Sequence, residues 1–322
     1  MNCPLKPTTV LARLAIACCL LCLTLFFGGC EDRQGEATST PPTMSAEPQA
    51  PPPRLLIGLV PEKDIFKQRG RYLPLVKYLS EQSGVTIELK ILSRYGNIVS
   101  NFTKDRFDGA FLGSFSFALF HKQLGLEPIA RPVELDGSST YHGIIFVRKD
   151  SGIRSGLMMK GKRFAFVEQA TMAGYLLPLH YFQTEGIADY RSWFGETYFA
   201  GSNTNSINDV LNKKADAGAT KVSTFNRLAK ESPLRAGELL ILANSPEIPG
   251  HTLAVRGDLD PIIKRKLKTT LLAMSDNPTG KFVLSRFGAR EFIETKNQDF
   301  QAVYQYAADI GLDLATYTSK NK

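Results

Sequence analysis

The sequence predicts an α/β protein with two lobes, each a mixed and mostly parallel sheet covered by helices. Two features of the chain after residue 54 carry this prediction. Short apolar runs such as residues 55–60 (LLIGLV) alternate with segments of helical periodicity such as residues 71–84. Strands that alternate with helices are joined by crossovers, which favours parallel pairing. The alternation also falls into two successive series of roughly a hundred residues each, a common size for one folding unit.

The first series contains three strands and three helices. Pro61 closes the first strand, and Gly84 ends the first helix at a position where glycine commonly caps. We expect strands at residues 55–60, 86–92 and 108–114, and helices at residues 71–84, 95–107 and 115–125.

The second series is richer in strands. We expect strands at residues 142–150, 162–169, 196–201, 216–220 and 238–245, and helices at residues 171–186, 203–215 and 221–232. Residues 251–259 form a further strand, and the tail from Asp260 forms three helices. The apolar face of one tail helix consists of Ile263, Leu267, Leu271 and Met274.

The first thirty residues differ from the rest of the chain. Lys6 and Arg13 precede a long apolar run that ends in Gly28, Gly29 and Cys30. This pattern resembles a bacterial lipoprotein signal, in which residues 1–29 are removed and Cys30 carries the lipid. An N-terminal transmembrane anchor is the alternative, and both interpretations place the globular part outside the cytoplasm. Residues 30–53 are rich in Pro, Ser, Thr and Ala, and we expect a disordered tether there.

Cysteine usage and net charge exclude several classes of site. All five cysteines lie within the first thirty residues, so the globular part has no disulfide, no thiol nucleophile and no cysteine metal site. The formal charge of +8 loses the contributions of Lys6 and Arg13 with the leader, and the remaining +6 favours anionic partners. No dense Lys/Arg stripe with interleaved aromatics is present, so we expect no nucleic-acid binding.

Polar side chains follow several predicted strands, where a sheet of this type binds ligands. Thr171 follows one strand, and Gly174 in the next helical turn would let the backbone approach a ligand closely. Ser114 and Ser116 could instead cap the helix that they begin. The polar cluster at residues 138–142 could instead be a solvated turn. The residues at these places are Tyr95, Ser114, Ser116, Thr140, Tyr141, His142, Thr171, Asn203 and Lys221. Together they predict an anion pocket lined by neutral donors.

Catalytic motifs are absent from the sequence. The four histidines are scattered without the spacing of paired metal ligands. The chain contains neither a G-x-S-x-G elbow nor a phosphate-binding P-loop. We therefore expect no catalysis, no metal and no cofactor.

Five segments, taken in order, resemble the phosphate/phosphite/phosphonate substrate-binding proteins of ABC transporters, the PhnD-like family. The segments are residues 58–84, 93–120, 136–153, 161–178 and 243–250. This resemblance covers about residues 55–312 and implies the type II periplasmic-binding-protein fold. It implies lobe 1 at residues 54–143 plus 251–322, lobe 2 at residues 144–250, and two strands that cross between the lobes as a hinge.

The resemblance also assigns roles to individual residues. It implies that Tyr95, the two serines after the third strand and residues 140–142 contact the ligand. The family's Ser-Thr-Ser-Gly phosphonate turn matches residues 171–174, where Ala173 has lost a hydroxyl. Family acids are replaced as well, because a His-Glu pair matches Asn203 and Thr204 and a carboxylate matches Ser223. These departures favour a plain oxyanion over a ligand that carries an ammonium group.

The expected protein is therefore an exported, lipid-anchored monomer, in the periplasm or at the cell surface. It captures phosphate, phosphite or a simple phosphonate and passes it to an ABC permease. A sensing module with a membrane signalling partner is the alternative that the sequence leaves open. An enzyme built on the same fold is a third hypothesis.

Overall fold

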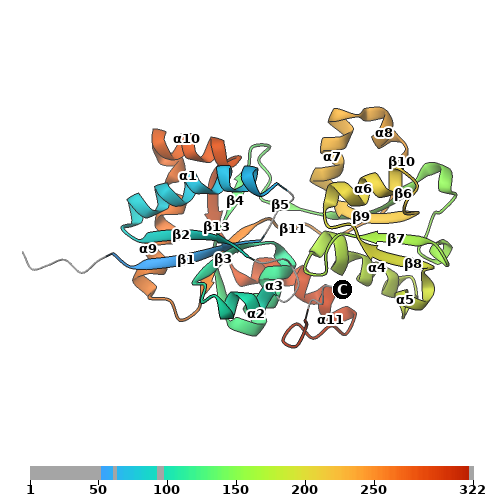
Figure 1. Cartoon of the computed structure of the whole chain (residues 1–322), viewed down its shortest axis with the longest axis horizontal. Coiled ribbons are helices and arrows are strands. Elements are labelled where there is room, and N and C mark those ends of the chain that lie inside the picture. The colour runs from blue at the N-terminus through green and yellow to red at the C-terminus, as the bar shows by residue number, and fades with distance from the viewer. Residues whose placement is uncertain (1–51, 61–63, 93–97, 319–322) are drawn as a thin grey trace, which may run out of the picture. The chain divides into compact units, whose positions relative to one another are not determined.

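The computed structural model describes residues 52–60, 64–92 and 98–318, all within one compact unit that runs from Ala50 to Lys322. Two separate sheets dominate it (Figure 1). The elements around the six-stranded sheet are called lobe 1 below, and those around the five-stranded sheet are called lobe 2. In the described part of the chain, no helix is both long enough and apolar enough to cross a membrane.

The lobe 1 sheet has the strand order β13-β4-β12-β3-β1-β2. Its strands are β1 (Arg54–Leu59), β2 (Thr86–Ile91), β3 (Gly109–Leu112), β4 (Leu126–Glu134), β12 (Thr252–Arg256) and β13 (Ala289–Glu294). Its helices are α1 (Ile65–Ser83), α2 (Ile98–Lys104), α3 (Ser114–Leu124), α9 (Pro261–Leu272) and α10 (Pro278–Phe287). The Asp64 carboxylate accepts from Lys67 N at 2.9 Å and caps α1, while Gly84 ends it in the left-handed region.

The lobe 2 sheet has the strand order β10-β6-β9-β7-β8. Its strands are β6 (Gly143–Arg148), β7 (Arg163–Phe166), β8 (Glu196–Phe199), β9 (Ala217–Lys221) and β10 (Leu239–Asn244). Its helical segments are the π-helical turn η3 (Met172–Leu176), α4 (Leu177–Thr184), α5 (Tyr190–Trp193), α6 (Asn203–Leu211), α7 (Val222–Glu231) and α8 (Pro233–Gly237).

The predicted two-lobed α/β architecture with mixed sheets is confirmed, but parallel pairs do not form the majority in the described sheets. The parallel pairs are β1–β2, β1–β3, β7–β8 and β7–β9. In lobe 1, β12 returns from lobe 2 and pairs antiparallel with β3 and β4, and β13 pairs antiparallel with β4. In lobe 2, β6 pairs antiparallel with both β9 and β10. Neither β4 nor β13 was expected, because Pro128 and Pro132 interrupt β4 and the charged residues of β13 favour a helix.

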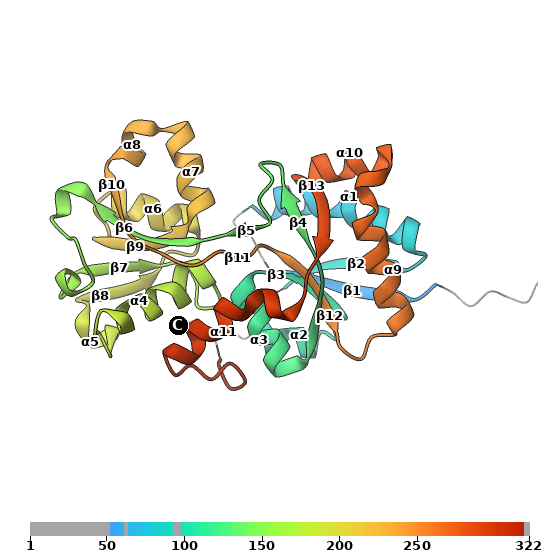
Figure 2. The same ribbon diagram turned by 180° about the vertical axis from the view of Figure 1, so that it is seen from behind.

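The two lobes are joined by a pair of short crossing strands. β5 (Thr140–Tyr141) pairs antiparallel with β11 (Ile248–Pro249), and the two segments run between the lobes in both views (Figures 1 and 2). The predicted two-strand hinge is therefore confirmed.

One apolar core continues from lobe 1 into lobe 2 on the side of α11 (Gln301–Asp309). It includes Phe117 of α3, Phe166 of β7 and Phe300, which precedes α11. The rings of Phe117 and Phe300 lie 4.1 Å apart, and α11 packs against both α3 and α4 (Figure 2). The C-terminal helix thus ties the two lobes together through burial of apolar surface.

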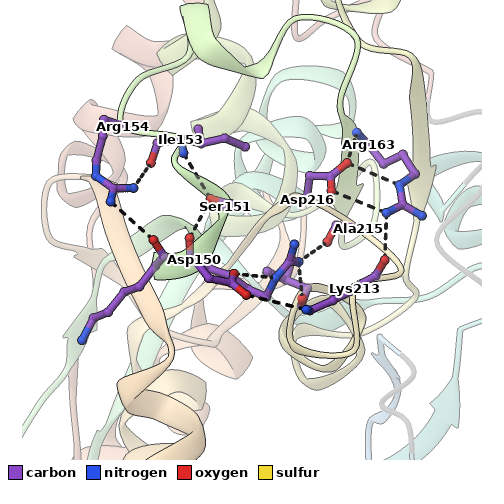
Figure 3. A network of polar contacts seen from close by, with 11 residues as sticks. Asp150, Ser151, Ile153, Arg154, Arg163, Lys213, Ala215 and Asp216 are labelled. Carbon is purple, nitrogen blue, oxygen red and sulfur yellow. Dashed lines mark hydrogen bonds and ion pairs between the residues drawn. The ribbon is translucent and has the colours of Figure 1, made fainter.

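Charged residues also hold lobe 2 together where β6 ends and β7 begins (Figure 3). The buried Arg148 donates from Nη1 to the carbonyls of Val210 and Ala215, at 2.7 and 3.0 Å. Asp216 accepts from Arg163 N at 2.9 Å and from Arg163 Nε at 3.3 Å. Desolvation alone would raise the pKa of Asp216, but the hydrogen bonds and charge of Arg163 outweigh it and lower the pKa. Asp216 is therefore a structural anion.

We expect Asp216→Asn to lower the free energy of unfolding at neutral pH by about 1–3 kcal/mol, because Arg163 loses a charged acceptor. The depressed pKa gives the wild type its advantage above the unfolded pKa of about 4, and the advantage disappears as pH falls through the folded pKa. Urea unfolding at pH 7 and at about pH 3 measures this. Asp150→Asn, which alters an exposed carboxylate of the same network, should cost less than about 1 kcal/mol. An Asp216→Asn loss that is the same at both pH values would contradict the assignment.

Candidate functional site

A cleft of about 1440 Å³ lies between the lobes and is lined by both of them and by the hinge. Its walls include most of the residues that the sequence singled out: Ser114, Ser116, Thr140, Tyr141, His142, Thr171, Asn203 and Lys221. Tyr95 and Cys30 fall outside the described residues. The topology therefore gathers side chains that are more than a hundred positions apart in the chain.

Three of these residues form a connected group across the cleft floor. The buried Ser114 Oγ donates to the Pro249 carbonyl at 2.9 Å. Because a serine has one hydroxyl hydrogen, the Tyr141 hydroxyl must donate in the 3.1 Å contact between Tyr141 Oη and Ser114 Oγ. Lys221 Nζ lies 4.4 Å from the centre of the Tyr141 ring, a cation–π distance. Lobe 1, the hinge and lobe 2 meet at this group.

Desolvation raises the pKa of Tyr141 to about 12, although its hydrogen bond with Ser114 acts in the opposite direction. The phenol therefore remains a neutral donor at physiological pH. The charge at this point of the cleft comes from Lys221, at the end of β9.

A second group lies where β7 leads into η3. Thr171 precedes η3 with extended backbone, and α4 continues the same helix. The first N–H groups of a helix have no partner within it and carry partial positive charge. The π-helical form of this turn is frequent at functional sites. An anion could therefore accept hydrogen bonds from the backbone here.

Gly174 has a different role from the one expected. A Cβ at this position would lie 2.2 Å from Val167 Cβ, and Val167 N donates to the Gly174 carbonyl at 3.0 Å. The glycine is needed because η3 packs directly against the end of β7. The expectation that it lets the backbone approach a ligand finds no support in these contacts.

The hydroxyls near η3 donate to protein carbonyls. Ser116 Oγ donates to the Ala170 carbonyl at 2.9 Å, and Thr171 Oγ1 donates to the Glu168 carbonyl at 2.6 Å. Each hydroxyl has one hydrogen, so both are already used in this conformation. Ser114 does not cap α3 either, because the N-cap position is Gly113. The alternative that these serines serve as helix caps is therefore wrong for Ser114.

The hinge residues share one carboxylate. His142 Nδ1 lies 3.1 Å from Glu247 Oε1. The pKa of Glu247 is lowered first by its hydrogen bond from Thr140 and then by that from His142. On the lobe 2 wall, Asn203 Oδ1 accepts from Lys221 N at 3.0 Å and fixes the start of α7.

The cleft is also lined by charged residues that the sequence analysis did not identify. The cations are Lys67 and Arg71 from α1 and Arg227 and Lys230 from α7, and the carboxylates are Asp64, Glu134, Asp136, Glu168 and Glu247. The sequence analysis predicted a pocket lined by neutral donors, but the cleft is lined by charged residues as well. Helical spacing was the available signal, since Lys67 and Arg71 are four apart and Arg227 and Lys230 three apart.

His251 also reaches the cleft and was not chosen from the sequence. Desolvation lowers its pKa, and the positive charges of Lys221 and Arg71 lower it further. The imidazole is therefore neutral at physiological pH.

Desolvation raises the pKa of Glu134, and the negative charge of Asp136 raises it further. The positive charges of Lys221 and Arg71 lower it. In the described residues, no group of three or more His, Cys, Asp or Glu side chains is placed to hold a metal ion.

Residues 57–300 match the model of the family described as "ABC transporter, phosphonate, periplasmic substrate-binding protein". The chain belongs to this family. It is 25% identical over 258 residues to the phosphonates-binding periplasmic protein of Escherichia coli K12, covering 79% of this chain and 75% of that one. It is also 25% identical over 264 residues to the phosphate-import protein PhnD of Mycolicibacterium smegmatis, covering 79% and 80%.

A solved structure of PhnD1 from Prochlorococcus marinus in complex with methylphosphonate has the same fold. Its TM-score is 0.66 at 22% identity, with 80% of this chain and 98% of that chain covered. The resemblance and the fold expected from the sequence are both confirmed. The chain is thus a periplasmic substrate-binding protein of the ABC-transporter type, and its curated relatives are binding proteins.

We expect Gly174→Ala to lower the free energy of unfolding by about 1–3 kcal/mol, because the added methyl group overlaps the Val167 side chain. Gly70→Ala is the matched control on α1, where nothing lies within 4 Å of the added Cβ. That change should stabilise the protein by about 0.5–1 kcal/mol. Thermal and urea unfolding of both variants measures the difference. A neutral Gly174→Ala would show that η3 does not need its close contact with β7.

Proposed function

We propose that the protein is a lipid-anchored binding protein that captures a small phosphorus oxyanion in the cleft and delivers it to an ABC permease. The observation that carries the proposal is the pairing of Lys221 with Tyr141 and Ser114 in the same cleft as the start of η3. A cation and free helix N–H groups suit an oxyanion, and the Tyr141 ring holds the cation beside the cleft. The residues proposed to surround the ligand are Tyr95, Ser114, Ser116, Thr140, Tyr141, His142, Thr171, Asn203 and Lys221. Ser116 and Thr171 act there by holding the backbone, because their hydroxyls donate to carbonyls.

A physiological affinity sets the number of hydrogen bonds that the cleft must supply to the anion. A hydrogen bond to a charged group contributes about 1.5–3 kcal/mol. Micromolar binding requires about 8 kcal/mol. Five or six such bonds therefore suffice after the costs of ordering and desolvation are subtracted.

The ligand that we propose is phosphate, phosphite or a simple phosphonate without an ammonium group. Asn203, Thr204 and Ser223 occupy positions where the family resemblance would place acids for an amine. Three of the carboxylates that line the cleft, Asp64, Asp136 and Glu247, have protein partners. Asp64 accepts from Lys67 N, and Glu247 contacts His142. They therefore do not need a ligand ammonium for charge compensation.

Capture and delivery need only lobe movement. The hinge of β5 and β11 allows the lobes to close around a ligand that contacts both of them. No covalent step is involved. A ligand that binds the closed form more tightly shifts the equilibrium toward that form. The permease would then recognise the ligand-bound protein by its closed conformation.

Titration calorimetry with the purified protein tests the ligand. We expect phosphate, phosphite or methylphosphonate to bind more tightly than 2-aminoethylphosphonate, because the amine adds a positive charge beside Lys221 and Arg71. Clearly tighter binding of the aminoalkyl compound would sink the ligand assignment.

Lys221→Met should weaken binding of the best anion about tenfold or more, since one charge-assisted contact is lost. Lys122→Met removes the same charge from α3 outside the cleft, where Lys122 lies 5.5 Å from the Tyr304 ring. Its affinity should match that of the wild type. Equal effects of the two substitutions would mean that only overall charge attracts the ligand.

Membrane attachment is proposed to depend on Cys30. We expect Cys30→Ala to leave the protein unprocessed, or to release it from the membrane fraction, because the thiol that carries the lipid is removed. Metabolic labelling with a fatty acid, followed by fractionation, measures this. Cys22→Ala, within the apolar run, is the control and should be labelled normally. Normal labelling of the Cys30 variant would exclude a lipoprotein anchor at this residue.

A further inference from the structure

Three consecutive carbonyls between β7 and η3 each accept a hydrogen bond from a hydroxyl. Thr171 Oγ1 donates to the Glu168 carbonyl at 2.6 Å, Tyr317 Oη to the Gln169 carbonyl at 2.9 Å, and Ser116 Oγ to the Ala170 carbonyl at 2.9 Å. Thr171 directly follows the three carbonyls in the chain, Tyr317 lies in the C-terminal segment after α11, and Ser116 belongs to α3 of lobe 1. Residues 168–170 are called the η3 entry turn below.

Fixing these carbonyls determines where the next N–H groups point. The peptide unit is planar, so a carbonyl and the following N–H lie on opposite sides of the chain. Thr171 N also donates to the Glu168 carbonyl at 3.1 Å, and this hydrogen bond closes the turn. The direction in which η3 starts is therefore set by the η3 entry turn, and with it the place where the first free N–H groups of the helix meet the cleft.

We infer that Tyr317 is a positioning residue for the ligand site, which it orients through the Gln169 carbonyl from behind the η3 entry turn. It is not among the residues that line the cleft. It acts on the ligand through the backbone, and this inference rests on the proposed binding of an anion at the start of η3.

The contacts of the C-terminal segment show how Tyr317 is held in place. Gln123 Nε2 of α3 donates to the carbonyls of Leu314 and Tyr317, at 2.8 and 2.9 Å. The Tyr317 ring lies 5.6 Å from the ring of the fully buried Phe115. α11 precedes this segment and lies beside both α3 and α4 (Figures 1 and 2). Lobe 1 thus holds the tyrosine that contacts the turn of lobe 2.

The tyrosine is also in the right protonation state to donate. Desolvation raises the pKa of Tyr317, and its contact with Tyr175 raises it further. Tyr175 belongs to η3, so the phenol touches the turn and the helix that follows it. At neutral pH the hydroxyl keeps the hydrogen that it donates to Gln169.

The test is Tyr317→Phe, which keeps the ring against Phe115 and removes only the hydroxyl. We expect phosphate and methylphosphonate to bind about fivefold or more weakly, with an unchanged thermal midpoint. Hydrogen exchange should quicken in peptides that cover residues 167–176 and nowhere else. Tyr304→Phe is the matched control on α11, because its hydroxyl contacts Asn297 away from the cleft. It should leave affinity and exchange unchanged.

A double variant checks the route. Gln123→Ala should weaken anion binding as well, because it frees the segment that carries Tyr317. If it acts through Tyr317, the combination with Tyr317→Phe should bind no more weakly than the weaker single variant. Additive losses would overturn this route.

Two results overturn the proposal itself. One is unchanged affinity together with unchanged exchange at residues 167–176 in Tyr317→Phe. The other is faster exchange across the whole core with a lower thermal midpoint, which would make the hydroxyl a general stabiliser. If the wild type binds neither phosphate nor methylphosphonate, the proposed function fails, and local exchange in the variant still decides whether Tyr317 positions the turn.

Discussion

A helix start can hold an anion only while its first N–H groups have no better partner, and this constraint organises the middle of the protein. The chain leaves β7, turns through residues 168–170 and begins η3 at the wall of the cleft. Rotation of those peptides would change the direction of the N–H groups that follow them. The three hydroxyls of Thr171, Tyr317 and Ser116 prevent this rotation. Their loss as direct ligand donors is the cost of a fixed backbone site.

This arrangement explains which features sequence analysis could reach. The alternation of apolar runs and helical segments identified the two lobes, and the polar residues at strand ends identified the cleft, because both follow from the local period of the chain. The direction of a hydroxyl does not follow from that period. Ser116 reaches the Ala170 carbonyl only because α3 packs against η3 in the folded protein. Sequence position therefore placed most of the chosen residues in one cleft without deciding which groups would face a ligand.

The unexpected strands and charges have similar causes. β4 carries two prolines, and it forms a strand because β12 and β13 pair with it on either side. The charged faces of α1 and α7 resemble ordinary solvated faces in the sequence. They line one cleft only because the fold places α1 in lobe 1 and α7 in lobe 2 (Figure 1). Tertiary pairing, which no local pattern contains, decided both outcomes.

The contacts that link the two lobes lie apart from the charged residues on the two walls of the cleft. Ser116 with Ala170 and Phe117 with Phe300 link α3 to lobe 2 and to the C-terminal segment on the side of α11. Arg71 of α1 and Arg227 of α7 line the cleft from lobe 1 and lobe 2. Rotation about the contacts on the α11 side changes the distance between the walls far more than the distances within the core. Like charges on the two walls oppose their approach, and an anion between them favours it. The negative charge that we propose to bind at the start of η3 would thus also stabilise the closed form, which gives the ligand the differential affinity that any closure requires.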